Sequence, residues 1–163
     1  MNYLRPAALT LTLSLAAAMA LPAERGQAKA TLAGKAVSIE YGRPTLQGRD
    51  MLGRAEVGSP WRMGADAPTR LKTAATLVFA PGIVVAPGEY VLTATKTGAD
   101  EWQLNIKKTD AAGDSAVIEV PLVSKVLPES VETFTIDLAG DKSQGDLTLK
   151  WGTKGLTASF TAR

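Results

Sequence analysis

The sequence predicts an all-β domain, an antiparallel β-sandwich or open barrel of about eight strands with one long arginine-rich loop. Two observations predict this fold. Beyond residue 35, apolar side chains recur at every second position in several short runs, which is the pattern of half-buried strands. Turn signals such as Pro-Gly and Gly-Asp separate these runs. We expect strands at residues 37–41, 74–79, 90–95, 102–107, 116–123, 133–138, 147–151 and 156–161.

The N-terminus has the features of an export signal. Arg5 precedes an uncharged run over residues 7–20 that ends in the small-x-small triplet Ala18-Met19-Ala20. Such a run is too short to cross a bilayer core of about 30 Å as a helix. We therefore expect a signal peptide over residues 1–20, cut as late as residue 28, and an exported chain that is periplasmic or secreted. The alternatives are a retained anchor or a buried helix.

The remaining chain predicts one domain over residues 29–163, a length usual for a single domain. It has no second long apolar segment, so we expect no membrane span in the mature chain. The residues of two further segments predict turns. The segment 152–155, with a glycine at each end, predicts a hairpin connection between two strands. The segment 141–146 predicts an Asx-type turn rather than a calcium loop, because the terminal acid of a calcium loop is missing.

The residues that are absent restrict the chemistry. The chain has no His and no Cys, which excludes a Ser-His-Asp relay, cysteine-bound zinc or iron–sulfur sites, and disulfides. We expect no cofactor, no metal and no catalytic residue of the usual kinds. The net charge of +2 gives no indication of nucleic-acid binding, which requires clustered positive charge.

The candidate site lies in residues 43–70, where no clean period appears. Five of the eight arginines fall here, at positions 43, 49, 54, 62 and 70, and no lysine does. Loops this long are uncommon in compact domains unless they are functional or disordered. The apolar and aromatic content favours an ordered loop, with room for one helical turn, that lies across a sheet edge or the mouth of the sandwich.

Arginine presents a planar fork that binds carboxylate or phosphate and stacks on aromatic rings. One hypothesis is that the loop lines a pocket for an anionic or sugar-like ligand. The candidate residues for that pocket are Tyr41, Arg43, Arg49, Trp61, Arg62 and Asp66. The alternative is that the arginines pair with Glu40, Asp50, Glu56 and Asp66 and hold the loop in place. Glu40 is interpreted as a structural ion-pair partner of a loop arginine, and Trp102 and Trp151 as core residues.

Several segments together resemble a known family. The first group is Ser38-Ile39-Glu40-Tyr41-Gly42-Arg43-Pro44, Gly48-Arg49 and Trp61-Arg62-Met63-Gly64-Ala65-Asp66. The second is Pro87-Gly88-Glu89-Tyr90, Asp100-Glu101-Trp102, Val131-Glu132-Thr133-Phe134-Thr135-Ile136 and residues 147–151. In this order they resemble the bacterial domain-of-unknown-function family DUF2911. The resemblance implies an exported, mostly β domain and no particular activity. Relatives often carry a longer, aromatic-rich insertion after the strand at 102–107, where this chain has only residues 109–114.

Three functions are compatible with the sequence. The first is a non-catalytic binding or interaction module of the cell envelope that uses the arginine and aromatic loop site. The second is a structural or protein-interaction domain. The third is a hydrolase without histidine that uses Glu40 or Asp66. The expected partner is a small ligand or an envelope protein of unknown identity, and the sequence favours a role without catalysis.

Overall fold

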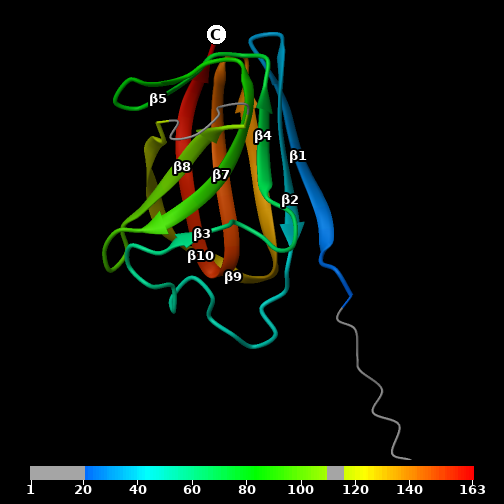
Figure 1. Cartoon of the computed structure of the whole chain (residues 1–163), viewed down its shortest axis with the longest axis vertical. Coiled ribbons are helices and arrows are strands. Elements are labelled where there is room, and N and C mark those ends of the chain that lie inside the picture. The colour runs from blue at the N-terminus through cyan, green and yellow to red at the C-terminus, as the bar shows by residue number, and fades with distance from the viewer. Residues whose placement is uncertain (1–20, 110–115) are drawn as a thin grey trace, which may run out of the picture.

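The computed structural model describes residues 21–109 and 116–163, and within them the chain is all β (Figure 1). The ten strands there are β1 (Glu24–Leu32), β2 (Lys35–Arg43), β3 (Pro60–Trp61), β4 (Thr69–Thr73), β5 (Leu77–Phe79), β6 (Ile83–Val85), β7 (Gly88–Lys96), β8 (Trp102–Lys108), β9 (Ile118–Asp141) and β10 (Gln144–Ala162). The predicted signal peptide lies outside the described residues. In the described part, no helix has the length and apolarity needed to cross a bilayer.

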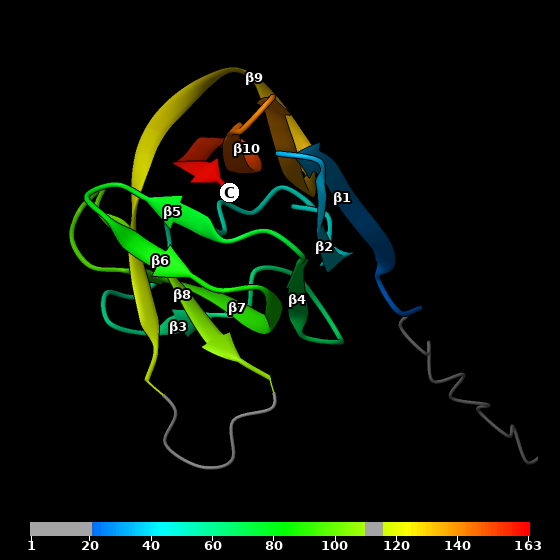
Figure 2. The ribbon, with the colours of Figure 1, turned by 90° about the horizontal axis from the view of Figure 1, so that it is seen from above.

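The strands form one antiparallel sheet that does not close into a barrel. Neighbouring strands follow the order β1-β2-β4-β7-β8-β9-β10-β5-β6, and β3 pairs with β7 beside this path. Strand β9 joins the two halves, because its first residues pair with β8 and the rest pair with β10. Seen from above, β9 sweeps as an arc from one half to the other, and the sheet curls around its core (Figure 2). The predicted all-β, antiparallel fold is confirmed.

Residues that alternate in polarity along the sequence alternate between the inner and the outer face of this curled sheet. In β8, Trp102, Leu104 and Ile106 are buried, whereas Gln103 and Asn105 alternate with them and are only partly covered. Successive side chains of a strand point to opposite faces, so one face of each strand reaches the core. The result is a single apolar core to which nearly every strand contributes.

Four strands lie outside the predicted set: the short strands β3 and β6, and the longer strands β1 and β4. Strand β1 pairs along its whole length with β2, but its inward residues include the small Ala28 and Ala30, which give little apolar signal. The fold therefore begins at Glu24, ahead of the predicted domain start at residue 29. The sequence pattern does not predict strand β4, because two of its three inward residues are the threonines Thr69 and Thr73. These side chains are 0% and 3% exposed.

The hairpin predicted at residues 152–155 is confirmed inside β10, which folds back on itself at Gly152, where φ is 63°. The two arms lie side by side: the hydroxyl oxygens of Thr148 and Thr157 are 3.2 Å apart, and Ser159 Oγ donates to Asp146 Oδ1 over 2.5 Å. A positive φ is what a tight hairpin turn requires. The predicted strands 116–123 and 133–138, by contrast, belong to the single strand β9. The turn predicted over 141–146 is shorter than expected, because β9 extends to Asp141 and β10 begins at Gln144.

The long loop between β2 and β4 covers residues 44–68 and closes the lower end of the molecule, away from the C-terminus (Figure 1). It contains the short strand β3 and one turn over residues 51–54, in which the Arg54 N–H donates to the Asp50 carbonyl over 3.3 Å, the i to i+4 bond of a single helical turn. Leu46 N–H donates to the carbonyl of Glu132 over 3.0 Å, and Phe134 N–H donates to the carbonyl of Pro44 over 2.9 Å. The start of the loop is therefore hydrogen-bonded to β9, a strand that is not a neighbour of β2 in the sheet.

Candidate functional site

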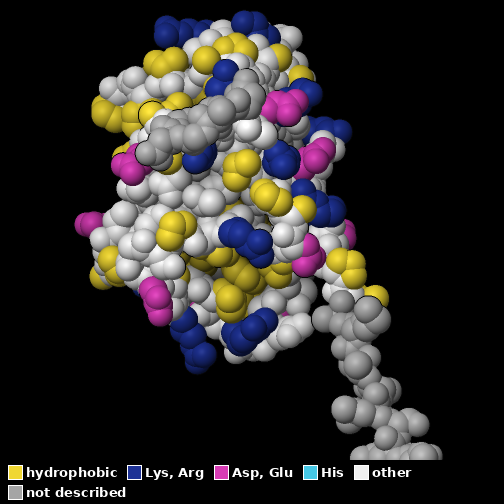
Figure 3. Space-filling view, viewed as in Figure 1, with side chains coloured by type: hydrophobic (Ala, Val, Ile, Leu, Met, Phe, Trp, Pro, Cys, Tyr) yellow, Lys and Arg dark blue, Asp and Glu magenta, His cyan; other side chains and the backbone are white. Residues whose placement is uncertain are grey.

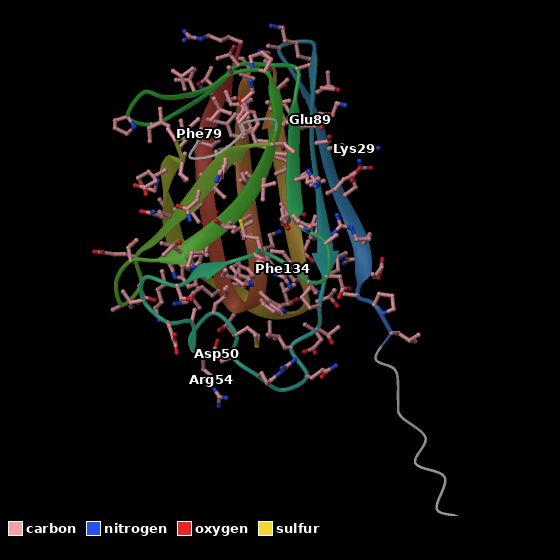
Figure 4. The ribbon with its side chains drawn as sticks, viewed as in Figure 1. Lys29, Asp50, Arg54, Phe79, Glu89 and Phe134 are labelled. Carbon is pink, nitrogen blue, oxygen red and sulfur yellow. The ribbon has the colours of Figure 1, made fainter. Side chains whose placement is uncertain are left out.

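The loop packs on a cluster of five aromatic side chains: Tyr41, Trp61, Trp102, Phe134 and Trp151. Trp61 stacks on Trp151 with ring centroids 5.7 Å apart and planes inclined by 14°. It meets Phe134 at 5.1 Å and Trp102 at 6.4 Å, both edge to face, and Tyr41 packs edge to face on Phe134 at 5.6 Å. Such ring pairs contribute beyond the area they bury. Phe134 lies just above the loop in Figure 4, so this aromatic cluster is the surface on which the loop packs.

Strand β3 places Trp61 in the aromatic cluster. Pro60 and Trp61 pair with Thr95 and Ala94 of β7, and Pro60 lies at the first position of a short edge strand, where a proline is tolerated. Trp61 is half-buried, whereas Trp102 and Trp151 are 3% and 4% exposed. Trp61 is thus the side chain that the loop itself contributes to the aromatic cluster.

The returning part of the loop is locked against β2 by a close backbone approach. A Cβ placed on Gly42 would lie 2.2 Å from the carbonyl oxygen of Ala65, which no real side chain tolerates. Next to it, Met63 is 0% exposed, and the buried Thr69 hydroxyl donates to the Met63 carbonyl over 2.6 Å. Glycine at position 42 is therefore a requirement for the packing of the loop on β2.

Arg43 has a carboxylate partner, but not one of the predicted acids. Its Nη1 lies 3.2 Å from Oε1 of Glu24 on β1, and Arg43 and Glu24 are direct neighbours opposite each other in the β1–β2 register. Its Nε is buried and has no hydrogen-bond partner. The pair is largely exposed to solvent, which limits its contribution to stability.

Other arginines around the loop donate to backbone carbonyls. Arg49 Nε donates to the Leu46 carbonyl over 3.1 Å, and Arg62 Nη1 donates to the Asp66 carbonyl over 3.5 Å. Arg25 reaches across from β1, where its Nη1 donates to the Ala67 carbonyl over 3.3 Å. These guanidinium groups donate to carbonyls of the loop, and none of the three forms an ion pair with a carboxylate among the described residues.

Arg54 and Arg70 are both exposed, but they differ in position. Arg54 projects outward from the bottom of the loop (Figure 4). Arg70 lies on β4, directly opposite Glu40 in the β2–β4 register. Arg54 therefore belongs to the loop surface, whereas Arg70 belongs to the outer face of the sheet.

The carboxylates near the loop accept hydrogen bonds from backbone amides. Each of three acids takes one such bond, which is the usual way in which an acid orders a turn. The pairs are Gly53 N to Asp50 Oδ1 at 2.8 Å, Ala23 N to Asp66 Oδ2 at 2.6 Å, and Gln47 N to Glu132 Oε1 at 3.0 Å. In the described part of the chain, no group of three acids is arranged to hold a metal ion.

Glu40 was predicted to form an ion pair with a loop arginine. The structure places its carboxylate 3.2 Å from the side-chain amide nitrogen of Gln27, which donates to it from β1. Glu40 lies on the exposed face of β2, away from the face that carries Ile39 and Tyr41 into the core. That orientation directs it toward β1 and β4 rather than toward the loop.

The six predicted ligand residues differ in their exposure to solvent. Tyr41 is 4% exposed, and its hydroxyl donates to the Ile136 carbonyl over 3.3 Å, so it is part of the core. Arg49, Arg62 and Asp66 remain exposed on the loop. A cavity of about 850 Å³ lies at the β9–β10 turn, at the opposite end of the molecule.

Four charged residues that contact the loop or its flanking arginine were not selected from the sequence: Glu24, Arg25, Lys96 and Glu132. They reach it from β1, β7 and β9. The pattern marks each of them only as an exposed position of a strand or its flank. Their role follows from contacts between segments that are 19 to 85 residues apart, and no local signal identifies such contacts.

A family model described as "Protein of unknown function (DUF2911)" matches residues 23–160 of the chain. The match begins one residue before β1 and ends within β10, so it includes both the loop and the aromatic cluster. No curated protein and no solved structure matches the chain.

Proposed function

The chain belongs to the DUF2911 family of proteins of unknown function, and we propose that it is a non-catalytic binding module whose arginine-bearing loop binds an anionic ligand. The ligand class is one that carries carboxylate or phosphate groups, acidic sugars included. The observation that carries the proposal is that Arg49 and Arg62 are held by neutral carbonyls, so their positive charge is oriented but not neutralised.

The charge of the loop region supports this proposal. Residues 43–70 contain five arginines against three acids, an excess equal to the net charge of the whole chain, +2. Two of these acids, Asp50 and Asp66, accept hydrogen bonds from backbone amides. Figure 3 shows basic side chains around apolar surface at the lower end of the molecule, where the loop lies. An anion that approaches this end meets cationic groups whose positions are already restricted.

Each tethered guanidinium keeps most of its hydrogen-bonding capacity. The fork has five N–H donors, and the contacts of Arg49 and Arg62 each use one nitrogen. Restricting a long side chain before binding reduces the entropy lost when a ligand is held. The same contacts that hold the loop in place therefore also prepare these two arginines for a carboxylate or a phosphate.

The arrangement of carboxylates favours binding over hydrolysis. Glycoside chemistry needs two carboxyl groups about 5–10 Å apart. Asp66 is bonded to Ala23 and Glu40 to Gln27, and these two partners are four residues apart along extended chain, roughly 13 Å. We propose that the module acts outside the cytoplasm, in the periplasm or after secretion, because residues 1–20 have the pattern of an export signal.

The proposal is tested by thermal shift and titration calorimetry of the purified chain with citrate and with polygalacturonate, and with maltose as the neutral control. We expect both anions to raise the melting temperature, with an effect that weakens in high salt. The double variant Arg49→Gln/Arg62→Gln is expected to weaken binding about tenfold. Arg163→Gln, which removes one positive charge at the opposite end of the molecule, is the control for the single variants Arg49→Gln and Arg62→Gln.

Two outcomes would contradict the proposal. One is a chain whose melting temperature does not respond to either anion at low salt. The other is an equal loss of affinity in the single loop variants and in Arg163→Gln, which would indicate that only the net charge matters. Circular dichroism of each variant checks that the β fold is retained.

A further inference from the structure

Two adjoining cavities flank the tip of the β5–β6 hairpin. One has a volume of about 470 Å³ and is lined by Ile83 of β6 and Trp102 of β8, with Pro121 and Leu122 of β9. The other, of about 520 Å³, is lined by Ala80 of the hairpin turn, with Val120, Pro121 and Val123 of β9. Both include Pro121, so they form one continuous surface, which we call the hairpin cleft. Strand β6 contacts β9 here, and Figure 2 shows the hairpin reaching toward β9.

The strands that border the hairpin cleft carry exposed apolar side chains. Of the six large hydrophobic residues exposed in the described part of the chain, four lie on β6, on β9 or directly before β9. They are Val84 at 48%, Val117 at 46%, Val123 at 70% and Val126 at 83%. Val123 also lines the second cavity. Apolar surface gathered in this way is typical of a binding surface for another molecule.

The two ends of the hairpin cleft carry opposite charges. Asp100, Glu101 and Glu119 line the first cavity, and none of its described lining residues is a lysine or arginine. Asp100 pairs with Lys154, but no ion pair joins Glu101 or Glu119 to a described residue. Lys125 lines the second cavity. An occupant with a basic group at one end and an acidic group at the other matches this arrangement.

The distance between the charged ends defines the kind of occupant. Glu119 and Lys125 are six residues apart on β9, which is roughly 20 Å along an extended strand. The residues between them include Val120, Pro121 and Val123, which line the cleft. A second extended chain of the same length repeats this spacing, whereas a compact small molecule does not. The cleft therefore matches a strand with an apolar centre and charged ends.

We propose that the hairpin cleft binds an extended segment of a partner protein, with a basic residue at one end, an acidic residue about six positions away and apolar residues between them. The basic residue meets Glu101 and Glu119, the acidic residue meets Lys125, and the apolar residues cover Pro121 and Val123. No residue of the loop lines either cavity, so the inference does not depend on the function proposed for the loop.

The experiment measures binding of the fluorescent capped peptide Lys-Ser-Val-Ser-Val-Ser-Glu, whose charged and apolar side chains share one face of an extended chain, to the full chain by anisotropy. The peptide with Gln at both ends is the neutral control. We expect the charged peptide to bind at least fivefold more tightly than the neutral one at low salt, and the difference to fall in high salt. Replacing Val123 by Ser is expected to weaken binding of both peptides, because it removes apolar contact.

The variants separate the site from general charge effects. Glu101→Gln/Glu119→Gln is expected to weaken binding of the charged peptide about tenfold and to leave the neutral peptide within twofold. Glu129→Gln, a change on the same strand outside the cleft, is the matched control and is expected to stay within twofold of the wild type. Equal affinity for both peptides, or an equal loss in Glu129→Gln, would overturn the proposal. So would a dimer in sedimentation that Val123→Ser dissociates, because the occupant would then be a second copy of the chain.

Discussion

The arginine-bearing loop and the hairpin cleft both place charged side chains beside apolar ones, yet they use them in opposite ways. In the loop, acids accept hydrogen bonds from backbone amides and arginines donate to backbone carbonyls. In the cleft, Glu101 and Glu119 have no ion-pair partner among the described residues, and Val123 is 70% exposed.

The comparison shows what a charged residue does in each setting. A long segment without strand pairing has many backbone groups to satisfy, so its charged side chains first stabilise the loop. The strands that border the cleft already satisfy their backbone groups through the sheet, so their charges are available to a partner. The predictions below test this contrast, beginning with the largest expected effect.

Removing the ring under the loop is expected to have the largest effect. Phe134 is 0% exposed and contacts Tyr41, Trp61 and Trp151. We expect Phe134→Ala to lower the free energy of unfolding by about 3–5 kcal/mol, measured by urea denaturation. Val123→Ala in the cleft is the comparison, and its effect is expected within about 0.5 kcal/mol. A cost below about 1 kcal/mol for Phe134→Ala would show that the loop does not depend on the aromatic cluster.

The next effect comes from the contact between β2 and the returning loop. In Gly42→Ala, the new Cβ would meet the Ala65 carbonyl oxygen at 2.2 Å, so the loop has to move away from β2. We expect a loss of about 1–3 kcal/mol and faster hydrogen exchange in residues 62–68. Gly48→Asn is the control: Gly48 has a φ of 73° and open space around it, a conformation that asparagine adopts readily. Unchanged hydrogen exchange in residues 62–68 of Gly42→Ala would contradict the interpretation that this contact holds the loop on β2.

A direct test of the contrast compares an acid of the loop with an acid of the cleft. Asp50→Ala removes the acceptor of the Gly53 amide at 2.8 Å, and we expect it to cost about 1 kcal/mol of unfolding free energy. Glu119→Ala removes a carboxylate without such a partner, and we expect a change within about 0.5 kcal/mol. If the two substitutions cost the same, the acids of the two regions do not differ in role.

The smallest effect concerns Asp100, the one acid of the hairpin cleft with a recorded ion-pair partner. The hydrogen bond from Lys154, its positive charge and the more distant Lys96 hold the pKa of Asp100 below its ordinary value of 3.8. The stability from this pair is therefore present above pH 3.8 and is lost as the pH falls through the lower, folded-state pKa.

Carbon-13 NMR titration is expected to show the depressed pKa of Asp100 in the wild type. In Lys154→Met the pKa of Asp100 is expected to rise toward 3.8, because both the hydrogen bond and the charge are removed. An unchanged pKa in that variant would show that another group lowers it. Asp100→Asn is expected to remove this part of the acid dependence of unfolding.

Much of the fold could be predicted from local patterns, and the exceptions have physical causes. The alternation in residues 102–107 predicts β8 because large apolar side chains enter the core there. Strand β4 escapes the same reasoning because threonines fill its inward positions; their hydroxyls are satisfied by the carbonyls of Met63 and Ala75. A buried threonine with a partner behaves like an apolar residue, but the partner is visible only in the folded chain.

Strands β9 and β10 illustrate a second limit. A glycine between two alternating runs predicts a tight turn, and the two arms of β10 do lie side by side, with the hydroxyl oxygens of Thr148 and Thr157 3.2 Å apart. The alternating runs at 116–123 and 133–138 predict two strands in the same way, yet they form the single strand β9, because that strand pairs with both arms of β10. Pairing between distant segments decided whether two runs form one strand or two.

For the candidate site, the sequence by itself identified the segment, its arginines and its order. The partners of those arginines were set by tertiary structure: Arg43 meets Glu24, and Arg49 and Arg62 meet carbonyls of the loop. The hairpin cleft has no signature in the sequence, because its lining comes from six separate strands and turns. Periodicity determines which face of a strand a residue occupies, but a hydrogen bond depends on atoms within about 3 Å of each other. Only the packing of the whole chain brings such atoms together.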